Sequence, residues 1–317
     1  MDNLTHTLTG LALSRAGLSR YYGRAPLLLM IAANIPDIDV TWSWRGSLRY
    51  LEHHRAITHS ISMIPVMALV SVLIVCGIGR SIRGWKIAWG LAIIGVASHV
   101  LLDWTNAYGI RLLLPFSSRW FQLDLTNIFD FWFWGILALA WLGPLLAKLV
   151  NSEMGAKAGP GRGLAIFALC FLMLYDAGRF FAHQRALEIL NSRIYQGGVP
   201  TRVAAFPGSA ANPLEWSGWV ETPVVVENFS MNEREQFDPE SGMVFYKPEP
   251  SPALDAARRT MLIENFLKFA RYPLWRVTPM TEPDGAQRVD VRDWRFPFTA
   301  SAIVDASNRV VATSFSF

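Results

Sequence analysis

Long apolar runs alternate with short polar segments through the first 195 residues of the chain. The segment Ile61–Gly79 contains no Lys, Arg, Asp or Glu. As a helix it would be about 28 Å long, close to the roughly 30 Å of hydrocarbon in a bilayer. Three further runs, Trp85–Leu102, Phe131–Leu146 and Leu164–Tyr175, are almost as poor in charge. The pattern therefore predicts four membrane-spanning helices.

Beyond about Tyr195 the chain becomes richer in Pro and Gly, and apolar and polar residues alternate as in short strands. The predicted strands are Leu214–Glu221, Pro223–Ser230, Met243–Lys247, Leu274–Met280, Gln287–Trp294 and Arg309–Phe317. One helix is expected to begin at Ser251-Pro252 and to end before Pro273. The expected fold is mainly α, with a polytopic helical membrane bundle over residues 1–195 and a soluble α+β domain over residues 196–317.

The composition agrees with a membrane protein and excludes several other classes. Hydrophobic residues make up 52% and charged residues 17% of the chain, whereas a soluble domain has about 25% charged residues. A disordered chain and a nucleic-acid-binding protein are thereby excluded, so no nucleic acid partner is expected. The two cysteines lie in apolar runs, which excludes a disulfide framework. The net charge of +4 suits basic loops beside a membrane.

Histidines and aspartates form four short clusters near the N-terminus, and five of the six histidines lie within the first 99 residues. The clusters are Asp2–His6, Asn34–Asp39, His53–Ser60 and His99–Asp103. Such residues are costly in a membrane protein unless they have partners, so their concentration indicates a functional site.

Helical hairpins would bring these clusters together. If Leu4–Ser19 and Pro26–Ile35 pair, the start of the first helix lies beside the end of the second. The same argument pairs Ile61–Gly79 with Trp85–Leu102. All four clusters then lie at one end of the bundle.

His99 and Asp103 are four residues apart and therefore lie on one face of a helix, where they could bind one ion. Imidazole and carboxylate suit Zn²⁺, and Mn²⁺ or Fe less well. The alternative is that the two side chains only form a hydrogen bond with each other.

The four segments MDNLTHTLTG, IPDID, HHRAITHS and HVLLDWTNAYG, within about residues 1–130, resemble a bacterial inner-membrane family of metal-dependent hydrolases, the YdjM type. That family is distantly similar to zinc-dependent phospholipase C and P1-type nucleases. The resemblance implies a helical hydrolase in the inner membrane that acts on a phosphoester. The metal ligands that it implies are His6, Asp37, His59, His99 and Asp103.

Two further residues match motif positions whose role is less clear: His54, which we include among the predicted ligands, and Asp39. The chain departs from the phospholipase pattern because no histidine lies between His99 and His183, and Glu188 follows His183 at the wrong spacing for a second ligand pair. One or two zinc ions are therefore expected. Asp124 and Asp130 are weaker candidates for a late ligand.

A mechanism follows as a hypothesis. Zinc would lower the pKa of a bound water. Either Asp37 or Asp39 would ligate or bridge the metal ions, and the other would accept the proton of that water. Arg55 would clamp a phosphoryl oxygen. The alternatives are that Asp37 is only a turn residue and that Arg55 only meets lipid headgroups.

Basic residues predict the orientation. The three short turns opposite the clusters carry Arg20, Arg24, Arg80, Arg83, Lys86, Lys148, Lys157 and Arg162. The cluster side carries Arg45, Arg49, Arg55, Arg111 and Arg119, in longer loops. The positive-inside rule places the turns in the cytoplasm and the metal site and C-terminal domain outside it.

The sequence is compatible with three functions. The leading hypothesis is an integral membrane metal-dependent hydrolase for a phosphoester or lipid-linked substrate. The alternatives are a transporter that uses the His/Asp residues as a relay, and a non-catalytic membrane anchor for the C-terminal domain. Clustering at one end favours the hydrolase over a relay, which needs ligands along a transmembrane path.

Overall fold

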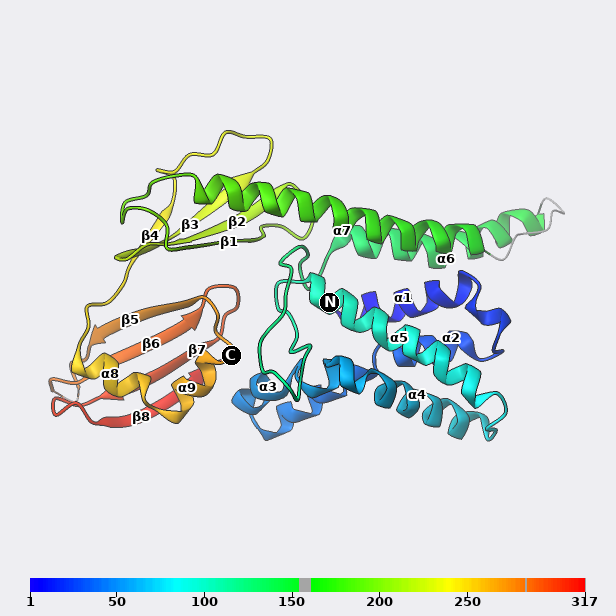
Figure 1. Ribbon diagram of the computed structural model, residues 1–317, viewed down its shortest axis with the longest axis horizontal. Helices are drawn as coiled ribbons and strands as arrows, with labels where there is room; N and C mark the ends of the chain where they lie inside the picture. The colour runs from blue at the N-terminus through cyan, green and yellow to red at the C-terminus, as the bar shows by residue number, and fades with distance from the viewer. Residues whose placement is uncertain (154–160, 283, 317) are drawn as a thin grey trace.

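A bundle of helices occupies one end of the molecule and two β-sheets occupy the other (Figure 1). The computed structural model describes residues 1–153, 161–282 and 284–316. The bundle contains α1 (Asn3–Arg15), α2 (Ala25–Ala32), α4 (Ile64–Gly79), α5 (Trp85–Thr105), α6 (Phe131–Glu153) and α7 (Arg162–Asn191). The turn between α6 and α7, including Lys157, lies outside the described residues.

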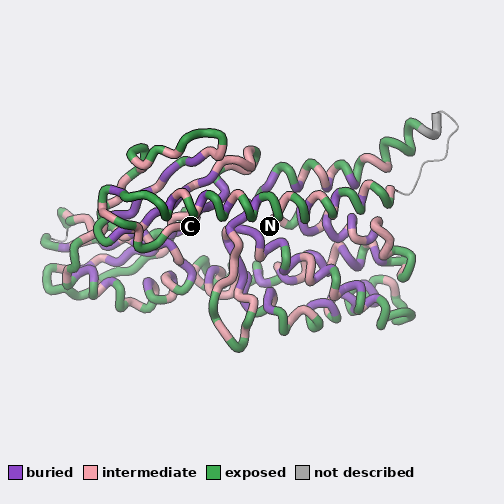
Figure 2. The backbone as a smooth tube through the Cα atoms, turned by 45° about the horizontal axis from the view of Figure 1, so that its top comes forward, coloured by how far each residue is buried: buried purple, intermediate pink, exposed green. Residues whose placement is uncertain are grey.

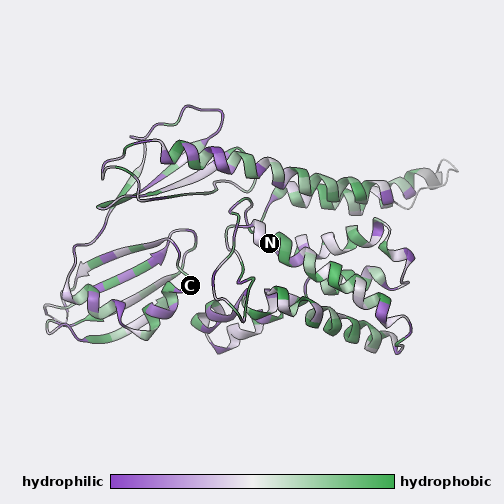
Figure 3. Ribbon diagram, in the orientation of Figure 1, coloured by the Kyte–Doolittle hydropathy of each residue, from purple (hydrophilic) through white to green (hydrophobic). Residues whose placement is uncertain are grey.

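Four described segments are helical, long and apolar enough to cross a membrane, as predicted: Ile61–Gly79, Trp85–Thr105, Phe131–Val150 and Arg162–Asn191. Most residues along these helices are hydrophobic (Figure 3). The fourth helix is much longer than the predicted Leu164–Tyr175. Its C-terminal part leaves the bundle and packs on the first β-sheet, burying Ala186 and Leu190 there.

Two glycines allow α1, α2 and α5 to pack closely. A Cβ atom on Gly10 of α1 would lie 2.4 Å from the carbonyl oxygen of Leu29 in α2. A Cβ atom on Gly95 of α5 would lie 2.8 Å from the Cβ of Ala32. Because neither glycine has a side chain, the backbones approach directly, and this brings the polar ends of α1 and α5 close to the end of α2.

Short helices connect α2 to α4 at the polar end of the bundle. They are η2 (Ile35–Arg45), α3 (Ser47–His53), η3 (Ile57–His59) and η4 (Ile61–Met63). Pro36 stands in the first turn of η2, where its missing N–H is no loss. Asp37 lies in η2, His59 ends η3, and His54 directly follows α3.

Each β-sheet is antiparallel, with four strands in sequential order. The first contains β1 (Arg202–Pro207), β2 (Glu215–Glu221), β3 (Val225–Asn232) and β4 (Met243–Tyr246). The second contains β5 (Pro273–Pro279), β6 (Gln287–Asp293), β7 (Thr299–Val304) and β8 (Val310–Ser316), packed against α8 (Pro252–Arg258) and α9 (Met261–Leu267). Buried positions lie inside the helical bundle and along the strands of both sheets (Figure 2).

Three parts of the fold prediction need correction. The chain as a whole mixes helix and strand and is not mainly α. The sequence pattern does not predict strands β1 and β7, because alanine has a low strand propensity. Burial of these alanines in the sheets stabilises both strands. The predicted single helix is two, since the hydroxyl of Thr260 caps a new helix. Phe317, the end of the last predicted strand, lies outside the described residues.

Candidate metal centre

The four His/Asp clusters meet at the end of the bundle that faces the β-sheets. Asp37 comes from η2, His59 from η3, and His99 and Asp103 from α5. One ligand atom from each of these four residues lies within 4.8 Å of the other three. His59, His99 and Asp103 have no exposed surface, and the Asp37 side chain is 13% exposed. Asp37 therefore lies where the cluster approaches solvent.

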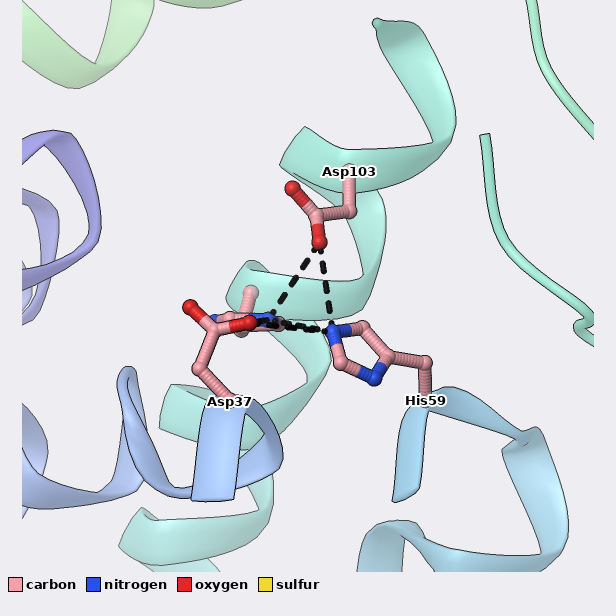
Figure 4. A group of neighbouring side chains, drawn as sticks. Asp37, His59 and Asp103 are labelled. Carbon is pink, nitrogen blue, oxygen red and sulfur yellow. Dashed lines mark hydrogen bonds and ion pairs between the residues drawn. The ribbon is translucent and has the colours of Figure 1, made fainter. Parts of the chain in front are cut away.

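The four ligand atoms are spaced as a small coordination shell. His59 Nε2 lies 3.4 Å from Asp37 Oδ1 and 3.3 Å from Asp103 Oδ2 (Figure 4). His99 Nε2 lies 3.6 and 3.4 Å from the same two oxygens, and 3.0 Å from His59 Nε2. Tetrahedral zinc with ligand bonds of about 2.0–2.1 Å holds its ligand atoms about 3.3 Å apart. The spacing therefore fits a zinc-sized ion.

Two of the four atoms have no hydrogen-bond partner of their own. Asp37 Oδ1 and Asp103 Oδ2 are buried and make no hydrogen bond. An unsatisfied buried carboxylate oxygen is costly, so each one needs an explanation. A cation held between these oxygens and the two imidazoles would satisfy both.

Neighbouring groups orient the two imidazoles. The carbonyl oxygen of Ala33 accepts a hydrogen bond from His99 Nδ1 at 2.7 Å, so that Nε2 faces the group. His59 Nδ1 lies 3.0 Å from Thr58 Oγ1 and 3.4 Å from Asp39 Oδ2. A carboxylate or carbonyl behind a ligating histidine is the usual outer shell of a metal site.

Asp39 lies behind His59 and is itself fully engaged. Its oxygens accept from His54 Nδ1 at 2.8 Å, from the backbone N–H of Arg55 at 2.8 Å and from Thr58 Oγ1 at 3.0 Å. Although burial opposes it, hydrogen bonds from His54 and His59 hold the pKa of Asp39 well below its usual range. Asp39, Asp37 and His54 also form a second group of ligand spacing, so the residues present could hold a second ion.

His6 is buried beside the four-residue group without being part of it. Its ring stacks on His99 with centroids 3.8 Å apart, and its Nε2 lies 3.4 Å from Asp103 Oδ1. Neither ring nitrogen has a hydrogen-bond partner. Burial lowers the pKa of His6 to about 3, so the ring is neutral and one ring nitrogen keeps a lone pair that could bind a metal ion. Asp2 caps α1 through the N–H groups of Leu4 and Thr5 and so fixes the turn that carries His6.

Arg55 is an internal partner of Asp103. Its Nη2 lies 3.1 Å from Asp103 Oδ1, which also contacts the α-amino group of Met1. The Arg55 side chain is only 3% exposed, so it does not meet lipid headgroups. Its φ of 56° lies in the left-handed region that non-glycine residues rarely adopt. Hydrogen bonds with Asp39 and Arg111 hold that backbone.

The charged residues of the group shift one another's pKa values. Burial alone would lower the pKa of His59, but contacts with Asp103, Asp37 and Asp39 raise it well above its ordinary value. Burial would raise the pKa of Asp37, but His99 and His59 lower it. His59 therefore lies among three carboxylates, and the same negative surroundings would favour a bound cation.

The remaining candidates lie elsewhere. His53 stacks on Trp42, and His183 contacts the carbonyl oxygen of Ala205. Asp130 caps α6, and Asp124 is buried near Arg271 and Arg295. Among the described residues, neither aspartate joins a group with ligand spacing, so the hypothesis of a late ligand gains no support.

Further residues support the cluster and are not among the site residues predicted from the sequence. Asn106 Oδ1 accepts from Arg55 Nη1 at 3.2 Å, and the Tyr108 ring lies under the Arg55 guanidinium. Both residues belong to the segment HVLLDWTNAYG that begins at His99, and this position is the signal that the sequence offers. The carbonyl of Ala33 and the arginines of the second sheet carry no such signal.

Comparison with known proteins decides the family. A model of the YdjM inner membrane protein family matches residues 1–186, more than half of the chain. The chain belongs to the YdjM inner membrane protein family. This confirms the resemblance seen in the motifs, and with the four candidate spans it makes the chain a membrane protein.

Two relatives from Bacillus subtilis (strain 168) are named as uncharacterized proteins. YfhP is 34% identical over 140 residues, which cover 41% of this chain and 42% of YfhP. YvsG is 32% identical over 131 residues, which cover 38% of this chain and 76% of YvsG. The match thus spans about two fifths of YfhP. No solved structure matches the chain.

Proposed function

We propose that this protein is an integral membrane metal-dependent hydrolase, with a divalent ion, most favourably Zn²⁺, held by Asp37, His59, His99 and Asp103. The observation that carries the proposal is the convergence of two imidazole nitrogens and two carboxylate oxygens at spacings of a tetrahedral zinc site. The orphaned oxygens of Asp37 and Asp103 support it.

A bound zinc ion would supply a water of lowered pKa and would polarise a phosphoryl oxygen. The residues around it divide the remaining tasks. Asp37 is the partly exposed member of the group, so it is placed to meet substrate and to accept a proton. Asp39 is assigned to orienting His59 and His54, because its oxygens are already engaged. Arg55 is assigned to balancing the charge of Asp103, in place of a phosphoryl clamp.

A phosphoester or lipid-linked substrate is the class we assign, since the site lies where membrane helices end and a polar headgroup would meet it. The transporter alternative requires ligands along a transmembrane path, and the cluster instead lies at one end of the bundle. The basic turns at the opposite end support an outward-facing site.

Metal content and activity test the proposal together. Protein purified in detergent without chelators should contain about one or two zinc ions per chain, measured by atomic emission. It should hydrolyse a phosphodiester or a phospholipid headgroup linkage, lose that activity with a chelator and regain it with zinc. A protein that takes up no divalent metal would refute the proposal.

Orientation is tested separately. A C-terminal fusion to alkaline phosphatase should be active and a fusion to green fluorescent protein dark, because the β-sheets should lie outside the cytoplasm. The reverse pair of results would place the cluster in the cytoplasm and would exclude extracytoplasmic substrates.

A further inference from the structure

The second β-sheet reaches the segment that follows α5. Arg295, just after β6, donates from Nη1 to the carbonyl oxygen of Ala107 at 2.8 Å. Arg271, just before β5, donates from Nη2 to the carbonyl oxygens of Ala107 and Tyr108 at 3.3 and 2.7 Å. Two guanidinium groups of the C-terminal region thus hold two consecutive carbonyls of the membrane domain.

Both arginine side chains are held by contacts inside the protein. The Arg295 side chain is 2% exposed and forms a two-point ion pair with Asp293, at 2.9 and 3.0 Å. That pair leaves Nη1 directed at Ala107. Burial lowers the pKa of Arg271 to about 9, so this group remains charged at neutral pH. Arg295 is paired with Asp293, whereas Nε and Nη1 of Arg271 are buried without a hydrogen-bond partner, so burying the Arg271 charge is costly. The cost suggests a role beyond ordinary packing.

The segment that the arginines hold supports Arg55. Asn106 Oδ1 accepts from the backbone N–H of Tyr108 at 2.6 Å and from Arg55 Nη1 at 3.2 Å. The Tyr108 ring lies 4.8 Å from the Arg55 guanidinium and meets the His54 ring edge-on at 5.4 Å. Arg55 in turn contacts Asp103 Oδ1. A continuous set of contacts therefore connects the second sheet to a proposed metal ligand.

Apolar packing joins the same parts. Leu51 of α3 and Tyr108 belong to one buried core with α8, α9 and the second sheet. Tyr50 packs against that core and stacks on His54. The second sheet therefore also packs behind the residues that contact His54.

We propose that Arg271 and Arg295 are positioning residues for the metal centre, which hold residues 106–108 so that Arg55 stays on Asp103. The inference rests on the proposed function, because its effect is on the metal site. The second sheet then contributes to the geometry of the metal site. The helical bundle without this sheet would bind the metal weakly.

Cobalt binding to the full-length protein in detergent tests this inference. Arg295→Gln and Arg271→Gln should each weaken Co²⁺ binding by about tenfold, the lower end of the effect seen when outer-shell partners are lost. Both should alter the ligand-field absorption of the bound cobalt. Arg292→Gln is the matched control, because Arg292 is an exposed arginine on β6, and it should bind cobalt like the wild type.

A double-mutant cycle separates positioning from a general loss of stability. If Arg295 acts through Arg55, Arg55→Gln combined with Arg295→Gln should bind Co²⁺ as weakly as Arg55→Gln alone. Multiplied losses would overturn the inference, as would unchanged affinity in both arginine variants. If Arg295→Gln does not fold, Arg271→Gln replaces it in the same double-mutant cycle with Arg55→Gln. A wild type that binds no cobalt refutes the proposed function itself, whereas intact binding that ignores these arginines refutes only this inference.

Discussion

Asp103→Asn is expected to lower zinc affinity by more than about 100-fold, beyond the range seen for outer-shell losses. Asparagine keeps the shape of the side chain but removes the charge that faces His59 and His99 through Oδ2 and Arg55 through Oδ1. Zinc per chain, measured by atomic emission after dialysis against a weak chelator, should fall close to zero. Asp255→Asn, on an exposed turn of α8, is the control and should keep full zinc.

The same substitution should also destabilise the metal-free protein. Arg55 is 3% exposed, so it would keep a buried charge without its carboxylate partner. Removing one member of a buried ion pair costs about 3–5 kcal/mol. Unfolding by denaturant in detergent should show this loss in Asp103→Asn and not in Asp255→Asn. Normal zinc content with normal stability would contradict both roles assigned to Asp103.

His59→Ala is expected to remove zinc and hydrolytic activity together. His59 contributes Nε2 to the ligand group, and its ring also links Asp37 to Asp39. Loss of a direct ligand should weaken binding by more than about 100-fold, exceeding the cost of an outer-shell change. Zinc content and phosphodiester hydrolysis measured on the same preparation provide the test.

His53→Ala is the matched control for that experiment. His53 lies in the same short motif, but its ring stacks on Trp42 away from the ligand group. It should keep zinc and activity close to the wild type. Equal zinc in the two variants would exclude His59 as a ligand, and equal loss would indicate that the motif acts through folding alone.

Contacts behind the two imidazoles explain why the ligands are pre-arranged. His99 is fixed by the carbonyl of Ala33, and His59 by Thr58 and Asp39. Each ring therefore presents Nε2 to the same point. Such preorganisation is typical of sites in which an outer shell sets the orientation of the ligands.

The sequence by itself determined the membrane helices and the residues of the cluster. An uncharged run as long as Ile61–Gly79 has few stable alternatives to a spanning helix. The spacing of His99 and Asp103 fixes them on one helix face, and hairpin pairing predicts which helix ends meet. These features depend on local composition and period, which a sequence displays directly.

Only the tertiary structure decided how the polar residues divide their contacts. Asp37 and Asp39 are two residues apart, yet the first faces His59 Nε2 and the second Nδ1. Arg55 contacts Asp103, and the second sheet holds the segment behind it. These contacts join residues up to 188 positions apart in the chain. Packing selects such partners, and no local pattern in the sequence encodes them.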